Sequence, residues 1–294
     1  MRNKLYEFRA DLLLLTVAIA WGVTFLMVQD AISTTPVYAF LFFRFALASI
    51  LMFIISYRFL NELNKKTILY GVILGIFLFS AFATQTFGLM YTKSSIVAFI
   101  TGLNVICVPF LTYLFFKDKI KLNVLIASFI AVIGLYLLTM SGTLVFEKGE
   151  FLTLICAILF ALQIIFTGKF SNQVNVFLLV LFQLITVSIL ALIFSLSLDS
   201  VTFNIPYNYA FFKAVIITAI FATVYAFLIQ TYMQQFTTAT KTAIIFTMEP
   251  VSAAIFAYFT ANEVLTIVQF IGAVLIILAT LIAELKFNKN PKHI

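Results

Sequence analysis

The chain has 294 residues, of which 64% are hydrophobic, 17% are aromatic and only 10% are charged. Soluble domains are about half apolar and about a quarter charged, so this composition excludes a water-soluble fold and indicates a membrane protein with many spans. The net charge of +7 is therefore interpreted as a determinant of membrane orientation, not as a nucleic-acid binding surface.

Ten segments are long and apolar enough to be membrane spans, since a helix that crosses the lipid core needs about 20 mostly apolar residues. In chain order, the predicted spans are Asp11–Val28, Pro36–Tyr57, Thr67–Met90, Ser94–Phe116, Leu122–Ser141, Glu150–Gly168, Val174–Leu198, Tyr209–Gln235, Thr240–Ala261 and Thr266–Leu285. The segments between them are short and carry turn residues. No soluble domain is expected.

The basic residues predict the orientation of the chain, because lysine and arginine near helix ends remain in the cytoplasm. With the N-terminus inside, fourteen Lys and Arg residues fall in inner segments and three in outer segments, and Arg44 lies within a span. Both termini are therefore expected to be cytoplasmic. A cleaved signal peptide ending at Ala18–Ile19–Ala20 is the alternative, but the apolar run continues to Val28, further than a signal peptide needs.

The two halves of the chain resemble each other. Matched polar positions recur at an offset of 139 residues in the first two spans and 145 residues later: Ser49 with Ser188, Ser56 with Ser195, Gln85 with Gln230 and Thr86 with Thr231. Because each repeat holds an odd number of spans, the second enters the membrane from the opposite side. The sequence thus predicts an inverted duplication, 1–143 and 144–294, an architecture typical of secondary transporters with a midplane site between the repeats.

Short motifs accompany this repeat. In chain order they are Ala20–Trp21–Gly22, Phe42–Phe43–Arg44–Phe45, Gly149–Glu150–Phe151–Leu152, Glu249–Pro250–Val251, Asn262–Glu263 and Gly272. Together with ten spans and short loops, they resemble the drug/metabolite transporter superfamily, EamA-type branch. The first repeat departs from that pattern, with Asn104–Val105 in place of glutamate-proline and Lys117–Asp118 in place of glycine-glutamate.

The resemblance implies an all-α integral membrane protein of ten transmembrane helices, built as two inverted five-helix repeats. It also implies a bacterial-type plasma (inner) membrane and a central substrate cavity lined by spans one, three, four, six, eight and nine.

Ionised and polar side chains inside the spans mark the candidate site, because they are costly in lipid and usually face protein or water. Arg44 in span two cannot lose its proton. It can counter an anionic substrate, pair with Glu249, extend to a water pocket at the outer side or contact the phenylalanines beside it. Trp21 in span one can stack on a substrate or serve in packing. Gln85 in span three and its partner Gln230 in span eight are expected either at gates or in helix–helix contacts.

Glu249 lies near the middle of span nine and is followed by Pro250, whose missing N–H leaves the carbonyl of Phe246 without its helical partner. A carboxyl group at this depth can carry a proton or bind a substrate ammonium. The alternative is a neutral glutamic acid that holds span nine against a neighbour. Asn104 is its repeat partner in span four, and serves either in binding or in an interhelical hydrogen bond.

The remaining candidates are polar or aromatic residues: Gln163 in span six, Tyr91 after span three, and Tyr225 and Tyr232 in span eight. The tyrosines can stack on a ring-bearing substrate, or anchor helices at the membrane interface. Asp118 and Glu263 are interpreted as helix caps.

Several function classes have no residues to support them. The chain lacks a phosphate-binding glycine loop, HExxH, GxSxG and cysteine–histidine clusters, so we expect neither ATP-driven pumping nor an enzyme, and no metal or cofactor. We predict a secondary transporter, an exporter by resemblance, that moves a small organic metabolite, amino acid or drug by alternating access, with proton coupling through Glu249 as a hypothesis. A lipid or lipid-precursor flippase of the same fold and, more distantly, a membrane-embedded enzyme acting on lipid are the alternatives. The expected partners are the substrate, membrane lipids, protons and a second copy of the chain, but not nucleic acid.

Overall fold

The computed structural model describes residues 2–92, 94–117, 120–139, 147–199, 205, 207–261 and 266–284. The first half contains α1 (Arg2–Ile32), α2 (Val37–Ser56), the 3-10 turn η1 (Tyr57–Glu62), α3 (Lys65–Tyr91), α4 (Ser94–Gly102), α5 (Asn104–Phe116) and α6 (Leu122–Thr139). The second half contains α7 (Lys148–Phe170), α8 (Val176–Leu198), α9 (Tyr209–Ala219), the π-helical turn η2 (Ile220–Tyr225), α10 (Ala226–Met233), α11 (Ala239–Phe246), α12 (Met248–Ala261) and α13 (Ile267–Glu284).

All ten predicted spans coincide with helices, and three of them are interrupted. Among the described residues, seven helices are long and apolar enough to cross a membrane, and α6 and α13 are shorter apolar helices. Span four is broken at Leu103, between α4 and α5, and span nine at Thr247, between α11 and α12. The second break directly follows Phe246. Pro250 has no N–H group and so cannot donate a hydrogen bond to the carbonyl of Phe246. Span eight contains η2.

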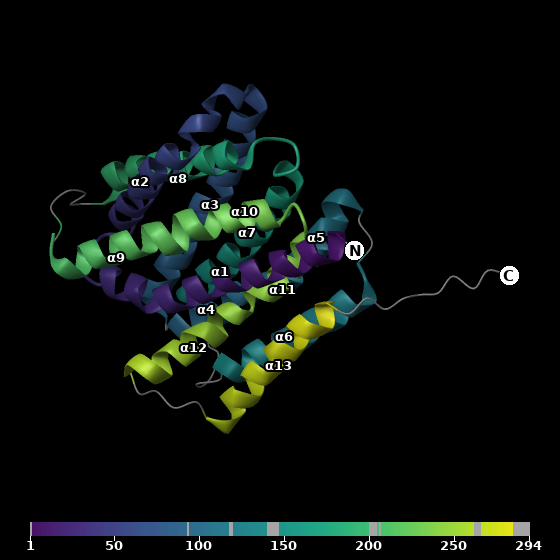
Figure 1. The fold of residues 1–294 in the computed structure, drawn as a ribbon. Coiled ribbons are helices and arrows are strands. Elements are labelled where there is room, and N and C mark those ends of the chain that lie inside the picture. The colour runs from purple at the N-terminus through teal and green to yellow at the C-terminus, as the bar shows by residue number, and fades with distance from the viewer. Residues whose placement is uncertain are drawn as a thin grey trace.

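Two pairs of equivalent helices, α2 with α8 and α6 with α13, lie side by side and run in opposite directions. Asp199, directly after α8, accepts a hydrogen bond of 2.9 Å from the backbone N–H of Ala39 in the first turn of α2. Near the end of α6, a Cβ atom added to Gly134 would lie 2.8 Å from the carbonyl oxygen of Gly272, near the start of α13. Figure 1 shows α6 and α13 together at one edge of the bundle. The repeats are therefore inverted.

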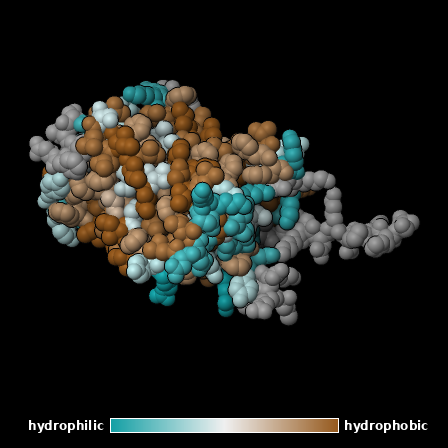
Figure 2. Space-filling model, turned by 90° about the horizontal axis from the view of Figure 1, so that it is seen from above, coloured by the Kyte–Doolittle hydropathy of each residue, from teal (hydrophilic) through white to brown (hydrophobic). Residues whose placement is uncertain are grey.

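Helix α1 begins and α13 ends on the same side of the molecule (Figure 1), which we call the N-side; the other is the far side. Basic residues of the described part gather at helix ends on the N-side, namely Arg9, Arg58, Lys65, Lys66, Lys117, Lys121, Lys169 and Lys241, whereas Lys148 and Lys213 lie on the far side. Figure 2 shows broad apolar areas between hydrophilic patches. Exposed side chains such as Ile54 and Phe129 suit helices that face lipid.

The contacts between the halves enclose a central space. Helix α1 packs against α10 and α12, and α3 packs against α7 and α8. The two broken spans, α4–α5 and α11–α12, contact each other, and each also packs against a helix of the other half, α7 or α1.

Candidate functional site

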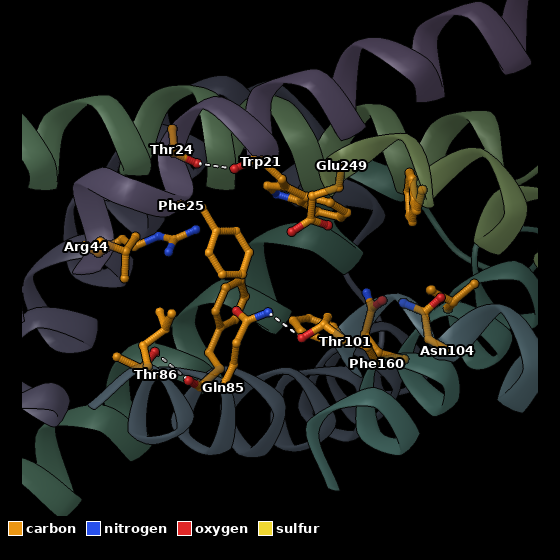
Figure 3. Close-up of a pocket in the computed structure, with 16 residues that line it drawn as sticks. Trp21, Thr24, Phe25, Arg44, Gln85, Thr86, Thr101, Asn104, Phe160 and Glu249 are labelled. Atoms are coloured by element: carbon orange, nitrogen blue, oxygen red, sulfur yellow. Dashed lines mark hydrogen bonds between the residues drawn. The ribbon is translucent and has the colours of Figure 1, made fainter. Parts of the chain in front are cut away.

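A cavity lies between the two halves and is lined by residues of both. Six of the ten predicted site residues line it: Trp21, Arg44, Gln85, Asn104, Gln163 and Glu249. Figure 3 shows the guanidinium of Arg44 pointing into the cavity from the left and the carboxylate of Glu249 pointing into it from above the centre. Residues from six different spans thus meet in one site.

The other four predicted residues do not line the cavity. Gln230 is fully buried beside it, and Tyr225 shares a hydrogen bond of 2.6 Å with the hydroxyl of Thr16. Tyr91 is half-exposed on the far side, where its hydroxyl accepts a hydrogen bond of 3.0 Å from Lys148. The half-exposed ring of Tyr232 contacts that of Phe236.

Glu249 and Asn104 both stand at the start of a helix that follows a break. Asn104 is the first residue of α5, and Glu249 lies in the first turn of α12. The Oδ1 atom of Asn104 is buried without a hydrogen-bond partner, and among the described residues no group donates to the Glu249 carboxylate. Both groups therefore have polar atoms available for a ligand. Gly22 brings α1 against this turn, because a Cβ atom there would collide with the carbonyl oxygen of Glu249.

Arg44 is held by the π-helical turn η2. Its Nε donates to the Thr223 hydroxyl at 2.8 Å and its Nη2 donates to the Ala222 carbonyl at 3.2 Å. The same carbonyl accepts a hydrogen bond of 2.9 Å from the Trp21 indole. The guanidinium also lies over the Phe82 ring, 4.7 Å from its centre. Of the roles predicted for Arg44, pairing with Glu249 does not occur in this structure, and contact with phenylalanine does.

A polar network bounds the cavity toward the N-side. Gln230 on α10 donates to Oε1 of Gln163 on α7 at 3.0 Å, and Gln163 donates to the Thr167 hydroxyl at 3.1 Å. Gln234 donates to the carbonyl of Ile164 at 3.1 Å. Toward the far side the boundary is apolar, where Phe25 and Leu89 belong to one buried cluster.

Ten further wall residues were not among the predicted ones: Thr24, Phe25, Val28, Phe82, Thr86, Leu89, Thr101, Phe160, Ile164 and Phe246. The repeat offsets contain a signal for three of them. The offset of 139 residues relates Trp21 to Phe160 and Gln163 to Thr24, and the offset of 145 relates Gln85–Thr86 to Gln230–Thr231. Applying the offset of 139 to Trp21 and Gln163 finds Phe160 and Thr24, whereas Thr86 is signalled by the repeated Gln–Thr pair.

Similar proteins point to one family. The model of the EamA-like transporter family matches residues 8–140 and again residues 147–284. An uncharacterized transporter of Archaeoglobus fulgidus is 32% identical over 277 residues, which cover 94% of this chain and 86% of that protein. An uncharacterized transporter of Buchnera aphidicola subsp. Schizaphis graminum is 30% identical over 159 residues, about half of each chain.

A solved crystal structure shares the fold, with a TM-score of 0.77 at 11% sequence identity over 94% of this chain and 96% of that one. The matched family is one of transporters and not of enzymes, and a transporter implies a small-molecule substrate. Two family matches that together span most of the chain lead to one conclusion: this multi-pass membrane protein belongs to the EamA-like transporter family.

Proposed function

We propose that the chain is a secondary transporter that carries a small organic solute, such as a metabolite, an amino acid or a drug, through the central cavity by alternating access. The observation that carries this proposal is an asymmetry between the repeats. Far-side wall residues of the first repeat have counterparts in the second that lie buried outside the wall: Val28 with Thr167, Phe82 with Phe227, Gln85 with Gln230, Thr86 with Thr231 and Leu89 with Gln234.

An inverted repeat can exchange the conformations of its two halves, which moves a cavity from one side of the membrane to the other. In this structure Gln163 and Gln230 are bonded to each other and only Gln163 reaches the cavity wall, whereas their counterparts Thr24 and Gln85 both line the cavity. After an exchange, Thr24 and Gln85 would approach each other and the Gln163–Gln230 bond would open toward the N-side. The asymmetry therefore supports alternating access with these pairs as gates.

Thiol labelling tests this exchange without knowledge of the substrate. In a background with Cys107→Ser and Cys156→Ala, single cysteines at Gln85 and Gln230 would be labelled with a water-soluble thiol reagent. Adding Gln234→Ala removes the hydrogen bond from Gln234 to the Ile164 carbonyl, which both single-cysteine proteins retain on the N-side. Its loss of about 0.5–1.5 kcal/mol should shift the two populations roughly 2- to 12-fold. Labelling of Gln230→Cys should rise and that of Gln85→Cys should fall.

Gln183→Cys is the matched control, since Gln183 is fully buried on α8 and does not line the cavity. It should remain unreactive in both backgrounds. Rates at Gln85→Cys and Gln230→Cys that rise together would indicate general loosening and would contradict the exchange.

Glu249 is our candidate for proton coupling, supported by its position on the cavity wall and by the lack of a hydrogen-bond donor to its carboxylate among the described residues. We expect Glu249→Gln to abolish transport driven by a pH gradient while solute exchange at equal pH persists. A Glu249→Gln protein that transports fully, with unchanged pH dependence, would contradict coupling. A facilitator without coupling would then be the mechanism.

The orientation is part of the proposal. The basic residues on the N-side support cytoplasmic termini in a bacterial-type inner membrane, because positive charge is retained in the cytoplasm. Export is proposed by resemblance to the family, and a homodimer stays a prediction. For a lipid flippase we would expect several basic side chains for a phosphate headgroup, but among the described wall residues Arg44 is the single cation. A small solute is therefore favoured.

A further inference from the structure

Arg44 is a buried cation that forms no ion pair in the described part of the chain, and the carboxyl group of Glu249 lies elsewhere on the same cavity wall. Its side chain is 3% exposed, and its described partners are a hydroxyl, a carbonyl and two phenyl rings. These neutral groups orient the guanidinium but leave its charge uncompensated. Burying an ion is costly unless an opposite charge pairs with it. The site therefore favours an anion from outside the chain.

The turn η2 sets the direction in which the guanidinium can bind such an anion. Thr223 donates its own hydroxyl proton to the carbonyl of Thr218 at 2.8 Å, five residues back, so its Oγ1 lone pairs face Arg44. Thr223 and Ala222 engage Nε and one N–H of Nη2. The remaining N–H groups, those of Nη1 and one of Nη2, have no described acceptor. Because the guanidinium is planar and rigid, these groups form a donor pair suited to a carboxylate.

The rest of the wall restricts the body of the ligand. Trp21, Phe25, Phe82 and Phe160 line the same cavity as the guanidinium. Aromatic walls of this kind suit a ring or another compact apolar group, because the transfer of such a group out of water is favourable in free energy.

We propose that Arg44, positioned by Thr223, is the anion subsite of the transport cavity, and that the substrate carries a carboxylate on a ring-bearing body. This inference rests on the proposed function and names its substrate class. Arg44 would contact the substrate, whereas Thr223 is a positioning residue that acts through Arg44.

Ligand-dependent thermal stability of the purified protein tests the charge requirement, because a compound that binds the folded state raises its melting temperature. The probes are four compounds with the same phenyl body: hydrocinnamate, its neutral amide, phenylpropylamine and phenethyl phosphate. Hydrocinnamate should stabilise the wild-type protein, and the amide and the amine should not at the same concentration. Equal stabilisation by the amide, a preference for the amine or the phosphate, or no stabilisation by hydrocinnamate of the folded protein would each overturn the proposal.

The variants test the residues. Arg44→Gln should remove the response to hydrocinnamate, and Arg44→Lys should weaken it, since lysine keeps the charge but loses the planar donor pair. Thr223→Val should raise the dissociation constant for hydrocinnamate about tenfold, as for one lost hydrogen bond to a charged group, and Thr223→Ser should restore it. If Arg44→Gln does not fold, the responses of Arg44→Lys, Thr223→Val and Thr223→Ser to hydrocinnamate test the proposal.

Thr186→Val is the matched control for Thr223→Val, because Thr186 lies on α8 outside the cavity and donates to the carbonyl of Phe182. Its hydrocinnamate response should equal that of the wild type. A Thr223→Val protein that loses stability but keeps the wild-type preference for the acid over the amide would show a merely structural role. The labelling of Gln85→Cys and Gln230→Cys involves no anion. Reciprocal labelling without hydrocinnamate binding would thus overturn the carboxylate and leave alternating access in place.

Discussion

The carboxylate of Asp199, at the end of α8, caps the first turn of α2 through the backbone N–H of Ala39, although 160 residues separate the two in the chain. A helix usually obtains this cap from a residue directly before it, but Pro36 in that position has no side-chain donor or acceptor. The second repeat thus supplies a cap that the first repeat lacks.

Removing this cap should destabilise the protein. We expect Asp199→Ala to lower the free energy of unfolding by about 0.5–2 kcal/mol, as for other lost caps, and Asp199→Asn to lower it less, because its amide oxygen still accepts. Asp30→Ala is the control, an exposed acid at the far-side end of α1, which should stay within about 0.5 kcal/mol. Unfolding in detergent measures all three, and equal effects of Asp199→Ala and Asp30→Ala would contradict the cap.

The same carboxyl group should make stability depend on pH. Burial raises the pKa of Asp199, which outweighs the lowering by its hydrogen bonds from Ser195 and Ala39. In the unfolded chain an aspartate titrates near about pH 3.9. The folded protein therefore holds this proton more tightly. The corresponding stability is complete below the unfolded pKa and is lost as the pH rises through the raised folded pKa.

Melting temperatures of the wild type and of Asp199→Asn, measured from about pH 3 to 8, check this sign. Between the unfolded and the folded pKa of Asp199, the melting temperature of the wild type should fall relative to that of Asp199→Asn as the pH rises. At higher pH the two curves should run parallel. Parallel curves throughout would show that Asp199 does not titrate differently on folding.

The approach of α1 to α12 depends on Gly22. An added methyl group would collide with the carbonyl oxygen of Glu249 and with Ser252, so we expect Gly22→Ala to cost about 1–3 kcal/mol and to reduce transport. Gly168→Ala is the control, because its Cβ would lie no closer than 3.9 Å to the Gln234 amide, and it should be neutral or stabilising by up to about 1 kcal/mol. Similar melting temperatures for the two variants would contradict the close contact.

The ion pair between Lys241 on α11 and Asp11 on α1 joins the halves at the N-side over 2.6 Å, with side chains only 15% and 11% exposed. Removing one partner leaves a largely buried charge, so Asp11→Leu or Lys241→Met should each cost up to about 3 kcal/mol. The double variant should be more stable than either single one. A double-mutant cycle measures this coupling, and additive losses would refute it.

The ten spans were predictable because apolar length is a local property of the sequence. The breaks within these spans were harder to predict from the sequence. Pro250 marks the break at Thr247, but the break at Leu103 lies ahead of Pro109 by more than a turn, and no local residue type marks it. The π-turn at Ile220–Tyr225 depends on the contacts of Thr223 with Thr218 and Arg44, which only the folded chain provides.

The residues of the site were likewise predictable only in part. Charged and amide side chains within spans are rare enough to stand out, and Arg44, Glu249, Asn104, Gln85 and Gln163 all reach the cavity wall. Phe25 and Phe82 cannot be told from the other phenylalanines in a chain that has 36 of them. Of the four candidates off the wall, Tyr91, Tyr225 and Tyr232 were predicted from residue type, which does not specify the face of a helix. Gln230 was predicted as the repeat partner of Gln85.

The pairing of α2 with α8 and of α6 with α13 has a consequence for biosynthesis. Each of these contacts joins one half of the chain to the other, as do those of α1 with α12 and of α3 with α7. The first five spans therefore leave the ribosome with their main packing surfaces still facing lipid. We expect the fragment 1–143 to remain a substrate for membrane proteases when made alone and to be protected when 144–294 is supplied from a second gene. The junction near residue 143 would then record an ancestral duplication, not a boundary at which the protein could be cut into units that fold by themselves.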